Sequence, residues 1–159
     1  MQLAQVFTVM IASPSDVPEA RTAVYESLAD WNDANTRHRN VILLPMKWET
    51  TAVPQLGTDA QDIINRQLVD HADIVFALFG NRLGQETTRD LSGTAEEMNR
   101  ANGAGKPVHT FFSEAPLPRD VDTEELERLR AFQNALGGLY STFSNIGELR
   151  SRVWQAIEH

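Results

Sequence analysis

The chain contains no cysteine, no long apolar run and little positive charge. Without cysteine there is no disulfide framework, no thiolate zinc site and no cysteine nucleophile. Apolar runs such as Val41 to Met46 are far shorter than the roughly 20 residues that span a bilayer, and no basic segment leads into a signal region. Fourteen Lys and Arg against twenty-two Asp and Glu leave a net charge of −8, which argues against nucleic-acid binding. We therefore expect a cytosolic protein that binds neither membranes nor nucleic acids directly.

The remaining composition is that of one ordinary globular domain. The chain has 159 residues, of which 42% are hydrophobic and 23% charged. This length is typical of a single domain with a substantial core, and the composition excludes a disordered or fibrous chain. We expect one domain over residues 1–159, either by itself or as a piece of a larger multidomain protein.

Strand patterns alternate with helical patterns along the chain. Strands are predicted at 5–12, 41–49, 74–79, 107–112 and 139–143. Helices are predicted at 17–35, 58–72, 94–102, 122–136 and from 144 or 145 onward. The strand at 74–79 is apolar at every position, as a central strand requires, and Pro45 indicates a bulge or an edge position. The alternation predicts an α/β fold with a doubly wound parallel sheet of about five strands.

Polar residues follow several of these strands, at the edge where parallel sheets bind ligands. The predicted strand ends bring four groups to this edge: Ser13 to Asp16, Trp48 with Glu49, Gly80 to Leu83, and Phe112 with Ser113. Each group also has a structural interpretation. Ser15 or Asp16 can cap a helix, Asn81 can form a turn, Arg82 can be a solvated charge, and Trp48 can either pack or stack on a ring.

The segment after the third strand delivers carboxylates to the same edge. It reads Gly80-Asn81-Arg82-Leu83-Gly84 and later Ser92-Gly93-Thr94-Ala95-Glu96-Glu97-Met98. Thr94 and Glu97 fit a capping box, which gives Glu97 a structural interpretation. The chain has no glycine-rich dinucleotide motif and no G-x-S-x-G, and its four histidines form no short-spaced pair. We therefore expect no metal site.

The first strand and its loop, F-T-V-M-I-A-S-P-S-D-V, and the third unit, G-N-R-L-G…S-G-T-A-E-E-M…G-K-P-V, resemble bacterial TIR-like domains. The resemblance covers most of the chain and implies a flavodoxin-like, TIR-like three-layer fold. Such domains either associate with one another or cleave NAD at the nicotinamide–ribose bond, some cyclising the product, in bacterial defence and signalling proteins. Matched on S-G-T-x-E-E-M, the implied catalytic residue is Glu97, with Glu96 as the alternative. Gly93-Thr94 stands where the commoner pattern has W-C.

A single carboxylate is enough for this reaction. Nicotinamide leaves a cationic glycoside as a neutral molecule and needs no proton, so one ionised carboxylate beside the ribose can stabilise the oxocarbenium-like transition state. NAD is then the substrate, and no cofactor is expected. We expect Ser13, Ser15 and the N-terminus of the first helix to bind phosphate, and Arg82 to add a charge-assisted contact. The remaining predicted binding residues are Asp16, Trp48, Asn81 and Ser92.

Two other functions fit the same residues. G-T-x-x-E at a helix start and G-K-P-V at the next strand also resemble nucleoside deoxyribosyltransferase-like enzymes, which act at an anomeric carbon too. The third hypothesis is a non-catalytic TIR interaction module. The expected partners are NAD or a related nucleotide and, through self-association, other TIR domains.

Overall fold

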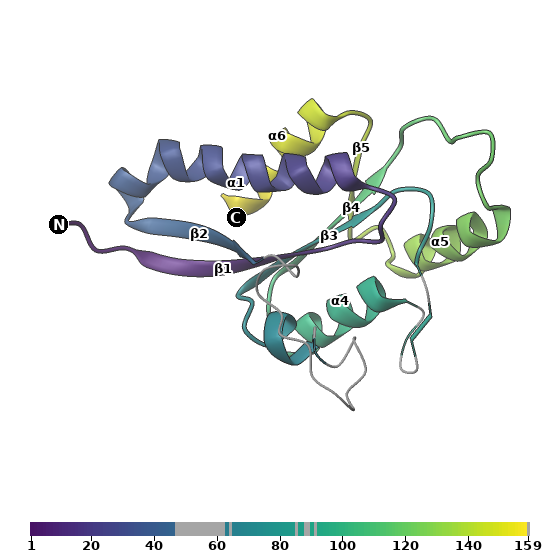
Figure 1. Cartoon of the computed structure of the whole chain (residues 1–159), viewed down its shortest axis with the longest axis horizontal. Coiled ribbons are helices and arrows are strands. Elements are labelled where there is room, and N and C mark those ends of the chain that lie inside the picture. The colour runs from purple at the N-terminus through teal and green to yellow at the C-terminus, as the bar shows by residue number, and fades with distance from the viewer. Residues whose placement is uncertain (47–62, 64, 85, 88–89, 91, 159) are drawn as a thin grey trace.

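Five parallel strands form one sheet, and helices cover both of its faces (Figure 1). The computed structural model describes residues 1–46, 63, 65–84, 86–87, 90 and 92–158. The sheet order is β2-β1-β3-β4-β5, and every neighbouring pair is parallel. The described elements are β1 (Gln5–Ala12), α1 (Pro18–Arg39), β2 (Val41–Met46), the π-helix η1 (Asn65–Val69), β3 (Ile74–Phe79), α4 (Gly93–Gly103), β4 (Val108–Ser113), α5 (Thr123–Ala135), β5 (Ser141–Phe143) and α6 (Ile146–Ile157). The predicted α/β flavodoxin-like fold is confirmed.

β3 lies at the centre of the sheet and is apolar because both of its faces are covered. Its last five residues are each at most 1% exposed. Phe76 and Leu78 pack in the cluster formed with α1 and α6, whereas Ala77 and Phe79 pack in the cluster formed with α4 and α5. Figure 1 shows α1 and α6 on one face of the sheet and α4 on the other. The prediction of a central strand at 74–79 is confirmed.

β2 is an edge strand, which is where Pro45 is tolerated. The backbone N–H of Leu43 donates to Asn32 Oδ1 at 2.9 Å, and the Asn32 amide donates to the Leu43 carbonyl at 2.9 Å. A side chain of α1 therefore satisfies backbone groups of this strand that β1 does not reach. The last three residues of the predicted strand, 47–49, lie outside the described residues.

The predicted helix at 58–72 also begins outside the described residues. Its described end contains η1, in which the N–H of Asp70 donates to the carbonyl of Asn65 at 2.9 Å. This is the wider turn of a π-helix, a feature often found at functional sites. Across the described residues, no helix is both long and apolar enough to cross a membrane.

Two predicted boundaries were wrong. The first helix continues past residue 35 to Arg39 and ends where Asn40 takes a left-handed conformation with φ 55°. Asparagine tolerates this conformation, and the basic residues before it suit the negative end of the helix dipole. The last strand begins at Ser141 and not at residue 139, because Gly137 and Gly138 have positive φ angles and Leu139 is exposed.

The chain reverses its direction across the sheet between β1 and β3. It runs from β1 outward to β2, and then returns to the other side of β1 to form β3. The helices that follow β1 and β3 consequently lie on opposite faces, and their connecting loops diverge at the carboxyl ends of the two strands (Figure 1). In open α/β sheets, ligands bind at this point of reversal.

A half-buried histidine in β4 makes folding sensitive to pH. Burial lowers the pKa of His109 below its ordinary value of 6.5, and its ring stacks on Phe76 with centroids 5.4 Å apart. Below about pH 6.5 the unfolded chain takes up this proton before the folded chain does, so stability falls as the pH falls. We expect the unfolding free energy in urea to decline more steeply from pH 7.5 to 5 for the wild type than for His109→Gln. The other histidines are common to both proteins, so parallel curves would contradict the prediction.

Candidate functional site

The loops that follow β1 and β3 are joined at the point of reversal by polar contacts. Asp16 Oδ2 accepts the backbone N–H of Asn81 at 2.9 Å. Arg82 Nε lies 3.6 Å from Asp16 Oδ1, and Arg82 Nη2 donates to the hydroxyl of Ser15. The structure thus brings together four of the residues that the sequence predicts for binding, although they are separated by about 65 positions in the chain.

Gly80 permits this close approach. A Cβ atom at residue 80 would lie 2.7 Å from Asp16 Oδ2 and 2.7 Å from Val17 Cγ1, closer than packed atoms allow. A Cβ at Gly84 would contact Pro14 at 3.7 Å and the Cβ of Ser92 at 3.6 Å. The start of α4 therefore adjoins the same pair of loops.

The expected cap of the first helix is wrong. The N-cap of α1 is Val17, which makes no side-chain capping bond, and neither Ser15 nor Asp16 caps the helix. The reason is the contact across the sheet edge: the Asp16 carboxylate accepts from the loop after β3 and does not turn toward the first turn of α1.

Arg21 fixes the other serine of the first loop. Its Nη1 donates to the carbonyl of Ile11 and to the hydroxyl of Ser13, both at 3.0 Å, and its Nη2 donates to the Tyr25 hydroxyl at 3.3 Å. Arg21 was not among the predicted binding residues. A signal was present, because Arg21 shares a helix face with Val17 and interrupts the apolar positions of that face with a charge.

α4 begins at a buried serine. Ser92 is the N-cap, is fully buried, and accepts the N–H of Ala95 at 3.1 Å. The predicted capping box of Thr94 and Glu97 is therefore wrong. Glu97 lies five residues after the cap, in the second turn, and is only 8% exposed, so its burial needs a cause other than capping.

The neighbouring carboxylate, Glu96, serves the packing of α4 against η1. It accepts from the Asn65 amide and from the Thr87 hydroxyl, the latter at 2.7 Å. One turn later, two 2.7 Å bonds join the Arg100 guanidinium to Asp70 and hold the pKa of that carboxyl below its ordinary value. These contacts fasten one face of α4 to η1.

Glu97 lies on a different face of the same helix. Residues four apart share a helix face, and Ala101, one turn beyond Glu97, packs in a cluster with residues of β1 and β3 and with Leu68 and Val69 of η1. α4 starts at the carboxyl edge of the sheet, so Glu97 is one turn nearer to that edge than Ala101. Residue 97 is thus on the buried side of α4 that Ala101 shares, near the carboxyl edge of the sheet.

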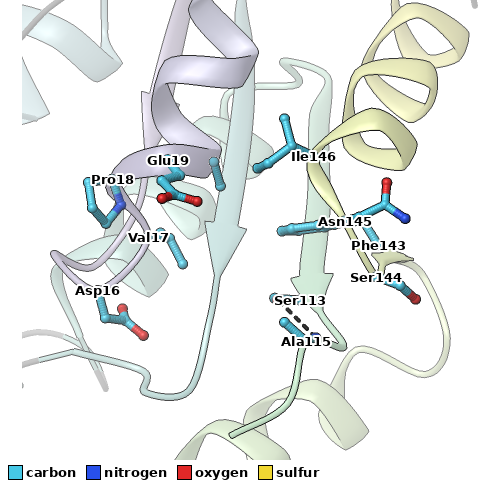
Figure 2. Close-up of a pocket in the computed structure, with 11 residues that line it drawn as sticks. Asp16, Val17, Pro18, Glu19, Ser113, Ala115, Phe143, Ser144, Asn145 and Ile146 are labelled. Carbon is cyan, nitrogen blue, oxygen red and sulfur yellow. Dashed lines mark hydrogen bonds between the residues drawn. The ribbon is translucent and has the colours of Figure 1, made fainter. Parts of the chain in front are cut away.

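A groove of about 550 Å³ opens on the opposite face of the sheet (Figure 2). Figure 2 shows the start of α1, with Asp16 to Glu19, on one side and the β5–α6 connection on the other. Ser113, predicted at this edge, lines the groove together with Ala115, whereas Phe143 to Ile146 were not predicted. The first loop therefore separates the groove from α4. Trp48 and Glu49 lie outside the described residues.

Comparison with known proteins identifies the family. A domain of unknown function (DUF4062) matches residues 8–158. The chain belongs to this family. No curated protein matches the DUF4062 chain. Its fold is similar to the crystal structure of a conserved protein from Enterococcus faecalis V583, with 16% identity, a TM-score of 0.51 and coverage of 95% of this chain and 99% of that one.

More distant structures have TM-scores below 0.5. A short-chain flavodoxin associated with a bacterial microcompartment shares 12% identity at a TM-score of 0.45, covering 99% of this chain and 98% of that chain. The TIR domain heterodimer of RPS4 and RRS1 shares 10% identity at 0.39, covering 98% and 100%. At these sequence identities, structural similarity indicates a shared fold and nothing about function. For the DUF4062 chain, the closer resemblance to TIR-like domains stays a prediction.

We expect Gly80→Ala to destabilise the domain, because the new methyl group would push the Asp16 and Val17 side chains away from the loop after β3. Overpacking of this kind costs about 1–3 kcal/mol of unfolding free energy. Urea unfolding would measure the loss. Gly103→Ala is the matched control, since a Cβ there meets no atom within 4 Å. Equal stability of the two variants would show that the loops tolerate separation.

Proposed function

We propose that this domain cleaves the N-glycosidic bond between nicotinamide and ribose in NAD, and that Glu97 stabilises the positive charge that develops on the ribose. The observation that carries the proposal is a buried carboxylate without a capping role at the start of α4. It lies on the helix side of Ala101, one turn nearer to the carboxyl edge of the sheet, and ligands of this fold class bind at that edge.

The chemistry requires one negative charge and no acid. As the bond between C1′ and the pyridinium nitrogen breaks, its electron pair leaves with nicotinamide, which becomes neutral. The ribose becomes an oxocarbenium ion, which a water molecule attacks with loss of a proton; attack by a nitrogen of the same nucleotide would give a cyclic product. A carboxylate in a site of low dielectric stabilises this cation more strongly than one in water.

The two central loops supply groups suited to the rest of such a substrate. Arg82 has a side chain that is 42% exposed at the sheet edge, and the Ser13 and Ser15 hydroxyls lie in the adjoining loop. A guanidinium and hydroxyl groups are ordinary partners of phosphate oxygens. We assign the diphosphate of NAD to this side of the site and the nicotinamide ribose to the side of Glu97.

The two adjacent glutamates differ in what they do for the fold. One carboxylate oxygen of Glu96 accepts from Asn65 of η1, and the other accepts from Thr87 in the segment before α4. Glu97, the next residue, lies about 100° further around the helix, on the side of Ala101. This division favours Glu97 as the catalytic group and makes Glu96 an internal control of equal size and charge.

We expect Glu97→Gln to lower nicotinamide release from NAD by a factor on the order of 100 or more, because the variant keeps the shape and loses the charge. Glu96→Gln should keep most of the activity while lowering stability. Both would be compared with the wild type at high protein concentration, with and without a crowding agent, because we also propose that the domain acts in self-associated form. In a bacterial defence or signalling protein, such activity would deplete NAD.

Each alternative has its own result in this assay. Loss in Glu96→Gln with full activity in Glu97→Gln would move the catalytic role to Glu96. Base exchange with 2′-deoxynucleosides, in place of NAD cleavage, would indicate a deoxyribosyltransferase-like enzyme. Absence of both reactions from assembled protein would favour an interaction module.

A further inference from the structure

Arg82 is held from two sides by the loop after β1. Its Nη2 donates to the Ser15 hydroxyl, and its Nε faces the Asp16 carboxylate. The Asp16 side chain is only 14% exposed, whereas that of Arg82 is 42% exposed. The carboxylate therefore lies behind the guanidinium, and the guanidinium faces solvent at the sheet edge.

The contact between the two charges leaves Arg82 able to bind a further anion. Asp16 Oδ2 is used by the backbone of Asn81, and Oδ1 lies 3.6 Å from Arg82 Nε, an ion-pair distance longer than a hydrogen bond. Within the described part of the chain, neither of these two atoms has a hydrogen-bond partner. The guanidinium has five N–H groups, so both hydrogens on Nη1 and the second on Nη2 are left for a ligand.

The serine hydroxyls beside Arg82 are also set to donate. Ser15 Oγ accepts from Arg82, and Ser13 Oγ accepts from Arg21. A hydroxyl that accepts a bond from an arginine still has its own hydrogen to give. Each arginine thus occupies the acceptor side of one serine hydroxyl and leaves its hydrogen to donate. An anionic ligand requires hydrogen-bond donors of this kind.

We propose that Asp16 is a positioning residue that holds Arg82 in place for a phosphate group, so that the domain selects nucleotides over nucleosides. Asp16 does not itself contact the ligand, because its carboxylate would repel phosphate and is already shared between Asn81 and Arg82. The choice of a nicotinamide nucleotide rests on the proposed function. The role of Asp16 rests on the contacts between the two loops.

The test measures binding without turnover. Nicotinamide mononucleotide and nicotinamide riboside differ by one phosphate, and their dissociation constants would be measured calorimetrically in the Glu97→Gln background. We expect the added substitution Asp16→Asn to weaken binding of the mononucleotide about tenfold and to leave riboside binding unchanged. Asp33→Asn, on the exposed side of α1, removes the same charge away from the loops and should change neither constant.

A double-mutant cycle separates positioning from general damage. If Asp16 acts through Arg82, then Asp16→Asn combined with Arg82→Gln should weaken mononucleotide binding no more than Arg82→Gln alone. Urea unfolding of each variant would establish that the compared proteins are folded.

Three results would overturn the proposal: additive losses in the cycle, equal weakening for both ligands, or tighter mononucleotide binding by Asp16→Asn through relief of repulsion. Failure of the folded parent protein to bind the mononucleotide would overturn it as well. Selective loss of mononucleotide binding in a protein that never cleaves NAD would instead support the positioning role and reject the proposed reaction.

Discussion

Two loops that leave neighbouring strands toward opposite faces of a sheet diverge unless something joins them, and in this domain the Asp16 carboxylate does so. It accepts the Asn81 N–H and faces Arg82, and Gly80 leaves room for it. The start of α1, the exposed side chain of Arg82 and, through Gly84 and Ser92, the start of α4 all lie around this contact. A charged group in this place also makes the edge of the sheet polar, although the strands beneath it are among the most apolar parts of the chain.

α4 shows how one short helix meets three different neighbours. Glu96 contacts η1 and Arg100 contacts Asp70 directly after it, Ala95 and Met98 pack in the cluster shared with α5, and Ala101 packs with β1, β3 and the apolar side of η1. Adjacent residues on a helix are separated by about 100°. Two consecutive glutamates can therefore have unrelated roles, one of them structural, without any change in backbone conformation.

The sequence was sufficient for the features that depend on neighbouring residues. The apolar run at 74–79 predicted a covered central strand, and Pro45 predicted a bulge or an edge position. The helix starts predicted at 122 and at 144 or 145 agree with the observed N-caps, Asp122 and Asn145. Features that depend on distant residues were beyond it. Aspartate is a common helix N-cap, but the carboxylate of Asp16 accepts the backbone N–H of a residue 65 positions away and does not cap α1. The Asn65 contact with Glu96 could not be predicted for the same reason.

The outer edge of β2 determines how the sheet can meet another molecule. The Asn32 side chain takes both backbone groups of Leu43, and two residues further along Pro45 has no N–H to offer. Backbone groups two apart in a strand face the same way. An incoming strand would therefore find its hydrogen-bonding positions blocked along this edge, a common protection against uncontrolled sheet growth. Over its described length, β2 is therefore poorly suited to pair with a strand of a second copy, which favours association through other surfaces of the domain.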